Sequence, residues 1–216
     1  EPIAQLRLDL MLFGTDGVSL QSQELTKALR KRGWRVHSCA SDVPDGAEGL
    51  RLSELSYQSD DALALRRSVF RPDASVDGLT SGKRLLEEIE ERARTVRARV
   101  EEYVDGQRIR LLHVRNIMSL PYNLAATLAF YQLIVERPDI HFLLQHHDLY
   151  WEGPNASSFH TPYPEIADLI ARITCPDRAN TTHVLINPIA ARALRERRGI
   201  EGVVIPDGFD FDRDVT

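Results

Sequence analysis

The chain lacks the features that mark several common classes of protein. It has 2 cysteines in 216 residues, Cys39 and Cys175, which are too few for a disulfide framework. Cys39 falls in an expected strand, and we interpret it as a small core residue. Basic residues are not in excess, since 27 Lys and Arg against 32 Asp and Glu give a net charge of −5. Nucleic acid is therefore not expected as a partner, because no net basic field attracts phosphates.

Long apolar runs are also absent. The most apolar stretch, residues 124–135, is too short to span a bilayer and contains Gln132. The first residues lack the basic region followed by an apolar region that marks a secretory signal. We therefore expect no transmembrane segment and a cytoplasmic location, while peripheral contact with a membrane stays open.

What the chain does contain is a regular alternation of short apolar runs with helical patterns. Strands are expected over residues 6–13, 34–40, 50–55, 109–114, 140–145, 183–186 and 203–205. Helices are expected over residues 19–32, 61–67, 80–104, 119–136, 165–173 and 188–198. Strands that alternate with helices indicate βαβ units. The predicted fold class is therefore α/β, a doubly wound and mostly parallel sheet with helices on both faces.

The helix expected over residues 80–104 carries a single apolar stripe. Its members are spaced by three or four residues: Leu86, Ile89, Ala93, Val96 and Val100. The stripe fits either a dimerising coiled coil or a helix docked on its own sheet. The docked helix is favoured, because fewer than three heptads are sustained.

Four hydrophilic clusters each follow an apolar run, where a buried strand would end. They are residues 14–17 (Gly-Thr-Asp-Gly), 115–116 (Arg-Asn), 146–148 (His-His-Asp) and 207–208 (Asp-Gly). In an open parallel sheet, ligands bind at the carboxyl ends of the strands. The clusters therefore predict a binding site along this edge of the sheet.

The turn at residues 14–17 lies between an expected strand and an expected helix. Glycine allows a ligand to approach closely, and a helix N-terminus offers free N–H groups and a partial positive charge. Phosphate or diphosphate is the natural ligand, although a tight turn without a ligand stays open. The spacing is neither the dinucleotide fingerprint nor a Walker loop, which argues against a Rossmann dehydrogenase.

The cluster at residues 146–148 has three interpretations: a metal site, a histidine that hydrogen-bonds a sugar, or a solvated capping group. Adjacent side chains on a strand point to opposite faces, so His146 and His147 would not both reach one ion without a bulge. No metal is therefore predicted. His113, inside the preceding strand, is interpreted as a satisfied core residue.

Two further features each have a functional and a structural interpretation. Arg115 and Asn116 either bind polar groups of a substrate or form a structural turn. Trp151, in the long loop over residues 149–164, either stacks on a sugar or an acyl chain or holds the loop in place.

Several of these segments resemble the retaining glycosyltransferases of the GT-B fold, family four. The similar segments are residues 14–19 (GTDGVS), 28–36 (ALRKRGWRV), 111–116 (LLHVRN), 144–152 (LQHHDLYWE) and 203–210 (VVIPDGFD). Asp207 stands where the family usually has Asn, and residues 56–80 carry no resemblance.

The resemblance implies a two-domain enzyme with its active site in the cleft between two Rossmann-like halves. Residues 1–205 would form the N-terminal, acceptor-side half. Residues 206–216 would begin the linker to a C-terminal donor-binding domain that is absent from this chain. The substrates would be a nucleotide-sugar and an unknown acceptor, with transfer under retention and without a cofactor or bound metal.

The resemblance also implies roles for single residues. His147 would be the catalytic residue, in contact with the donor sugar near the reacting centre, and Gly17 would lie beside the donor diphosphate. The other residues predicted to bind donor or substrate are Gly14, Val18, Arg115, Asn116, Asp148, Trp151 and Asp207.

Two alternatives stay open from the sequence. One is a module that binds a sugar or nucleotide without chemistry. The other is a nucleotide-sugar epimerase of the same architecture, for whose acid and base the clusters offer Asp16 and Asp148. On the transferase interpretation we expect the isolated chain to be inactive, because half of the electrostatic environment of the leaving diphosphate would be missing.

Overall fold

The computed structural model describes residues 5–8, 17–43, 48–71, 81–153 and 155–206, with the backbone alone for 5–8 and 17–21. Within these residues seven strands form one parallel sheet in the order β3-β2-β1-β4-β5-β6-β7. The strands are β1 Gln5–Leu8, β2 Val36–Ala40, β3 Gly49–Arg51, β4 Leu111–Arg115, β5 His141–His146, β6 Thr181–Leu185 and β7 Val203–Val204.

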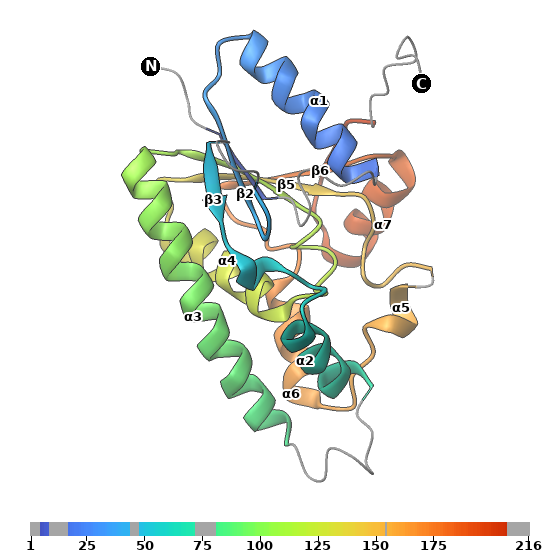
Figure 1. Ribbon diagram of the computed structural model, residues 1–216. Helices are drawn as coiled ribbons and strands as arrows, with labels where there is room; N and C mark the ends of the chain where they lie inside the picture. The colour runs from blue at the N-terminus through green and yellow to red at the C-terminus, as the bar shows by residue number, and fades with distance from the viewer. Residues whose placement is uncertain (1–4, 9–16, 44–47, 72–80, 154, 207–216) are drawn as a thin grey trace, which may run out of the picture.

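Helices lie on both faces of this sheet, as Figure 1 shows. They are α1 Gly17–Lys31, η1 Ser53–Leu55 (a 3-10 turn), α2 Asp60–Phe70, α3 Gly82–Gln107, α4 Leu124–Glu136, α5 Asn155–Ser158, α6 Pro164–Ile173 and α7 Pro188–Arg198. Helix α1 lies on one face, and α3, α4 and α6 share the large hydrophobic core on the other. The predicted doubly wound α/β fold is therefore confirmed.

The apolar stripe of α3 packs against its own molecule, so the docked-helix interpretation is confirmed. Ile89, Ala93, Val96 and Val100 are at most 1% exposed and belong to the core that contains α4 and the sheet. The stripe begins at Leu85, which is 1% exposed, whereas Leu86 is only partly buried. Burial of this face leaves no apolar stripe on α3 for a coiled coil.

Two helix boundaries differ from the expectation. Helix α4 does not begin near Ser119, because residues 116–122 fold into turns and the side chain of Asn123 caps the helix by accepting from the Ala126 amide at 3.1 Å. Helix α3 does not end at residue 104 but runs on through Gly106 to a left-handed cap at Arg108, with φ of 55°. The predicted helix end at Gly199 is confirmed, with φ of 71°.

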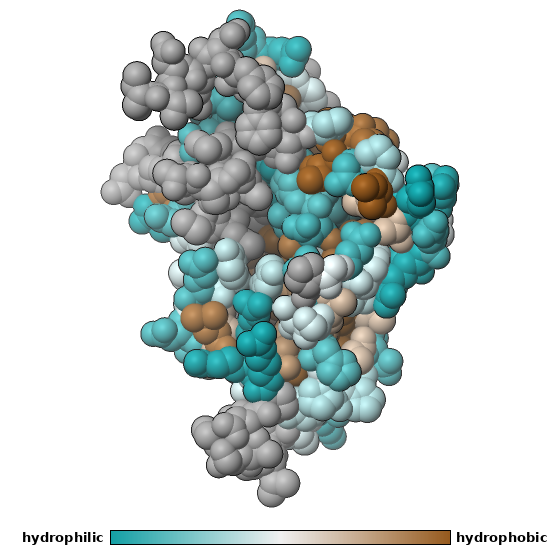
Figure 2. All heavy atoms as spheres, turned by 90° about the vertical axis from the view of Figure 1, so that its right-hand side faces the viewer, coloured by the Kyte–Doolittle hydropathy of each residue, from teal (hydrophilic) through white to brown (hydrophobic). Residues whose placement is uncertain are grey.

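The described residues contain no helix that is both long and apolar enough to cross a bilayer. Figure 2 shows the side that carries α5 and α7 as largely hydrophilic, with a few apolar side chains among them. The exposed large hydrophobic residues of α7 and the β7 region are Ile189, Val203, Val204 and Ile205.

Candidate functional site

The strand order places the predicted cluster residues at the switch point of the sheet. The chain passes from β1 to β2 in one direction across the sheet and from β4 to β5 in the other. Ligands of open α/β sheets bind at the carboxyl ends of the strands where the order reverses. Arg115 is the last residue of β4, Asn116 follows it, and His147 follows β5. The fold therefore brings residues of two separate clusters to one edge.

Asn116 connects the ends of β4 and β5. Its backbone has φ of 59°, a left-handed conformation that Asn tolerates better than most residues. Its backbone N–H donates to the backbone carbonyl of Gln145 at 2.9 Å, and its side-chain Oδ1 accepts from the backbone N–H of His147 at 2.9 Å. These bonds fix the backbone from which the imidazole of His147 extends.

The ring of His147 is held at both nitrogens. Nδ1 lies 3.1 Å from Asn116 Oδ1, which can only accept, so Nδ1 carries the hydrogen. Nε2 then accepts from Nη2 of Arg115 at 3.3 Å. Because this second bond is long and the residue is half-buried, a hydroxyl group of a ligand can compete for Nε2. The ring is thus set up as a hydrogen-bond acceptor.

Arg115 places a guanidinium inside the protein at this edge. The residue is 2% exposed, and its Nη1 donates to Oγ of Ser22 in α1, which is fully buried. Taking a charge out of water is costly unless polar partners hold it. The sequence prediction missed Ser22, because its partner is 93 positions away and no local pattern connects the two. The positive charge of Arg115 lies beside α1, the helix that follows β1, and this position suits an anionic ligand because the N-terminus of a helix also favours negative charge.

His146 points to the opposite face of the sheet from His147, as the alternation of a strand predicts. Its Nε2 lies 2.9 Å from Nδ1 of His183, whose Nε2 donates to the carbonyl of Pro176 at 3.0 Å. Burial lowers the pKa of both imidazoles, most strongly that of His146. His146 is fully buried, so the solvated interpretation is wrong for it.

Metal coordination finds no support in the described part of the chain. These residues contain no group of three or more His, Cys, Asp or Glu side chains arranged to hold an ion. The core interpretations of two other residues are confirmed. His113 is 2% exposed with Nε2 2.7 Å from Gln145 Oε1, and burial raises the pKa of the fully buried Cys39 thiol.

Of the remaining predicted site residues, some lie in described segments and others outside the described residues. The half-buried ring of Trp151 has the guanidinium carbons of Arg197 and Arg198 at 5.2 and 5.8 Å from its centre. Asp148 is exposed in the turn after β5. The functional assignments stay predictions: Gly17 and Val18 begin α1, whereas Gly14 and Asp207 lie outside the described residues.

A solved structure shares the fold of this chain. A glycosyltransferase from Rickettsia africae has a solved structure that superimposes with a TM-score of 0.53 at 15% identity, covering 98% of this chain and 44% of that one. This likeness shows the fold, the Rossmann-like α/β architecture of GT-B glycosyltransferases.

Two curated relatives match the chain in sequence. The chain is 31% identical over 201 residues to mannosylglucosylglycerate synthase of Thermotoga maritima, a match that covers 93% of this chain and 44% of the relative. It is 28% identical over 199 residues to the synthase of the same name from Petrotoga mobilis, with 92% and 43% covered. No family model matches the chain. The chain thus spans less than half the length of the curated relatives it matches.

Proposed function

We propose that the chain is the acceptor-side half of a retaining GT-B glycosyltransferase, family four, that uses a nucleotide-sugar. The observation that carries the proposal is the cluster of Arg115, Asn116 and His147 at the switch point of the parallel sheet. The sequence similarity to two synthases that form glycosidic bonds supports it. Residues 1–205 would form this half, and residues 206–216 would lead to a donor-binding domain.

In the proposed reaction, the bond between C1 of the sugar and the diphosphate oxygen breaks. A bond from C1 to the acceptor oxygen forms on the same face of the sugar, and the proton of the acceptor hydroxyl passes to the leaving diphosphate. The buried cation of Arg115 and the N-terminus of α1 would stabilise the negative charge on the diphosphate. Nε2 of His147 would accept a hydrogen bond from the sugar. The proposed reaction uses neither a metal nor a cofactor.

The names of the relatives also suggest the substrates. Their product contains mannose, glucose and glycerate. We therefore propose that the full-length protein transfers a mannosyl group from a nucleotide-sugar to glucosylglycerate. Such an acceptor has several hydroxyl groups and a single carboxylate.

The test incubates the full-length protein with a nucleotide-mannose and glucosylglycerate. We expect release of a nucleoside diphosphate and a product whose new bond has the anomeric configuration of the donor, read by NMR. The 216-residue chain alone should release none, and steady transfer by it would overturn that expectation. Binding of ligands without turnover would favour a binding module, and donor conversion without an acceptor would favour an epimerase.

A further inference from the structure

A second cavity lies away from the cluster of Arg115, Asn116 and His147. It has a volume of about 520 Å³ and is lined by η1, α2, the middle of α3 and the start of α4. Figure 1 shows α2 beside the lower part of α3, on the face of the sheet opposite α1. This volume falls within the range of about 300–1,000 Å³ that is usual for small-molecule sites. None of the three cluster residues lines it.

The lining of the cavity combines an apolar floor with a polar rim. Leu65, Val69 and Val96, which are at most 8% exposed, belong to the floor. Serine, threonine and asparagine side chains stand at the rim: Ser53, Ser56, Ser59, Thr95 and Asn123. The side-chain amide of Asn123 is already bonded to backbone groups of Glu54, Ser56 and Ala126. A floor of carbon with serine and threonine hydroxyl groups around it suits a small, hydroxylated molecule.

One arginine in this lining is available to an anion. Arg66 is half-buried, and its guanidinium carbon lies 4.3 Å from the centre of the Tyr122 ring. Among the residues that the structure describes, its guanidinium makes no hydrogen bond or ion pair. By contrast, Arg92 of the same lining is bonded to the carboxylate of Glu88 and the carbonyl of Asp61. Arg66 is placed over an aromatic ring, and within the described part of the chain its N–H groups have no acceptor, which suits bidentate binding of a carboxylate.

The other charges of the lining restrict the ligand further. Helix α4 begins at the cavity with Leu124 and Ala125, so its positive end favours an anionic group there. Glu54 and Asp61 are exposed at the rim, where their carboxylates can accept hydrogen bonds from hydroxyl groups and disfavour a ligand with several negative charges. A ligand with one acidic group and several hydroxyl groups satisfies both conditions.

The cavity is connected to the switch-point cluster through the loops that follow β4 and β5. The ring of Tyr122 lies 4.9 Å from that of Phe159, which lies 6.2 Å from that of Tyr150. The amide of Tyr150 donates to the carbonyl of Ser119, three residues after Asn116. Ring contacts and one backbone hydrogen bond therefore join the lining of the cavity, at Tyr122, to the loop that follows Asn116.

We propose that this cavity binds the acidic end of a carboxylate-bearing glycoside, with Arg66 paired to the carboxylate. The identification of that glycoside as the acceptor rests on the proposed function. The binding itself does not, because it follows from the lining of the cavity.

The test measures binding to the full-length protein without a nucleotide-sugar, so that no turnover occurs. Glucosylglycerate is titrated by calorimetry, with glucosylglycerol as the neutral match that lacks only the carboxylate. We expect Arg66→Met to weaken the binding of glucosylglycerate by about tenfold to a hundredfold, the range expected for a charge-assisted bond. Binding of glucosylglycerol should not change. Arg66→Lys, which keeps the charge but not the planar guanidinium with its two parallel N–H donors, should give an intermediate loss of affinity for glucosylglycerate.

Arg67→Met is the matched control, because Arg67 is the next residue of α2 and is exposed outside the cavity. The affinity of the Arg67→Met variant for glucosylglycerate should equal that of the unaltered protein. Thermal melting should show that the Arg66→Met, Arg66→Lys and Arg67→Met variants all fold. Equal binding of the acidic and neutral glycosides, or an unchanged affinity in Arg66→Met, would overturn the proposal. If Arg66→Met weakens binding but the full-length protein transfers no sugar, the cavity assignment stands and the proposed function fails. If transfer occurs and Arg66→Met leaves the KM for the acceptor unchanged, the cavity assignment fails.

Discussion

An arginine lies at each edge of the sheet, the half-buried Arg137 at the amino edge and the buried Arg115 at the carboxyl edge, and the two have different partners. At the amino edge, Arg137 donates to Asp105 at 2.8 Å and to Asp139 at 2.9 Å, two carboxylates that are about half exposed. At the carboxyl edge, Arg115 is 2% exposed and donates to the hydroxyl of Ser22 and the ring of His147. Acids at the surface neutralise the guanidinium of Arg137, whereas the guanidinium of Arg115 lies in the interior, where Ser22 and His147 are among its partners.

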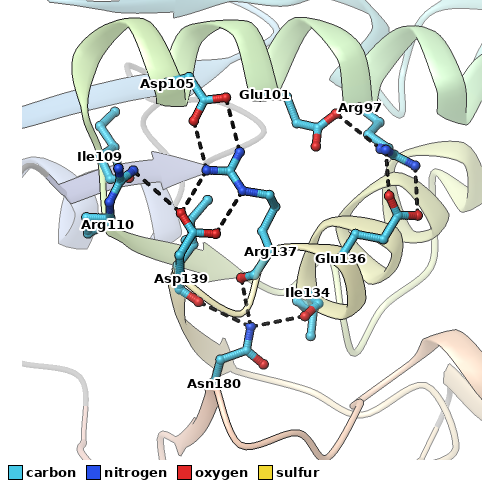
Figure 3. Close-up of polar contacts among 11 residues, drawn as sticks. Arg97, Glu101, Asp105, Ile109, Arg110, Ile134, Glu136, Arg137, Asp139 and Asn180 are labelled. Carbon is cyan, nitrogen blue, oxygen red and sulfur yellow. Dashed lines mark hydrogen bonds and ion pairs between the residues drawn. The ribbon is translucent and has the colours of Figure 1, made fainter.

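Figure 3 shows how the amino edge is connected. Hydrogen bonds with Asp139 and Asp105 raise the pKa of Arg137, and Arg137 in turn lowers the pKa of Asp139. Asn180 donates from Nδ2 to the backbone carbonyl of Ile134 in α4 and to those of Arg137 and Ile140 between α4 and β5, at 3.0–3.2 Å. These contacts join elements to each other, whereas those of the carboxyl edge fix side chains at a position where ligands bind. We therefore expect the amino edge to serve stability and the carboxyl edge to serve function.

The largest effect should come from His147→Ala in the full-length protein. Loss of an acceptor at the reacting sugar should lower kcat by about a hundredfold, while the free energy of unfolding changes by about 1 kcal/mol or less. Steady-state kinetics and urea unfolding measure the two quantities. An unchanged kcat would remove His147 from the site.

The buried pair His146 and His183 should make stability depend on pH. Burial lowers the pKa of both from the ordinary value of 6.5, so the unfolded chain binds protons at a pH where the fold does not. Stability should therefore be complete above about pH 6.5 and fall as the pH drops below it, by up to about 1.4 kcal/mol per unit for each histidine.

Urea unfolding at three pH values between 7.5 and 5 measures this slope. Burial also lowers the pKa of His37, which contributes with the same sign, so the unaltered chain is compared with His183→Gln. The slope should be shallower in the variant. Equal slopes would contradict a neutral His183 in the fold.

A smaller effect is expected from Ser22→Ala, which removes an acceptor from buried Arg115. The free energy of unfolding should fall by about 1–2 kcal/mol, and kcat/KM for the donor by roughly fivefold. Ser22→Thr keeps a hydroxyl and serves as the conservative control. If only stability falls, with kcat/KM intact, Ser22 is structural and does not position Arg115 for the donor.

The smallest effect should come from Asp139→Asn at the amino edge. Because the carboxylate is largely in solvent, the loss at pH 7 should be about 0.2–1 kcal/mol, with kcat unchanged. The pKa of Asp139 lies below its ordinary value of 3.8, so its contribution is present above that pH and is lost as the pH falls through the lowered pKa. The difference in stability between variant and unaltered chain should therefore shrink as the pH is lowered below 3.8. A change in kcat would contradict the separation between the two edges.

Local patterns predicted the elements well wherever the signal lay within one turn or one strand. The basic last turn followed by Gly199 identified the end of α7, and the three-and-four spacing identified α3. Where a helix boundary was predicted wrongly, the sequence contained two competing signals. Ser119 and Pro121 resemble a helix start, but Asn123 provides the cap that the structure uses, and Gly106 tolerates a helical conformation before Arg108 ends the helix.

The site was predicted in part for the same reason. Strand ends are visible in the sequence, and parallel strands bring their ends together, so Arg115, Asn116 and His147 could be grouped in advance. Ser22 was not predicted as the partner of Arg115, nor His183 as the partner of His146, because each contact joins distant segments. Arg66 lies in residues 56–80, where neither motif nor resemblance gave guidance, and its cavity exists only through the packing of three helices.

The sequence by itself determined the alternation of strands and helices, the parallel sheet and the polar residues at its carboxyl edge, because these follow from the spacing of apolar and turn-forming residues along the chain. The tertiary structure alone decided which imidazole faces the core, which hydroxyl holds the buried guanidinium and where a cavity remains. Those outcomes depend on which distant side chains meet when the helices pack on the sheet, and no local spacing encodes such meetings.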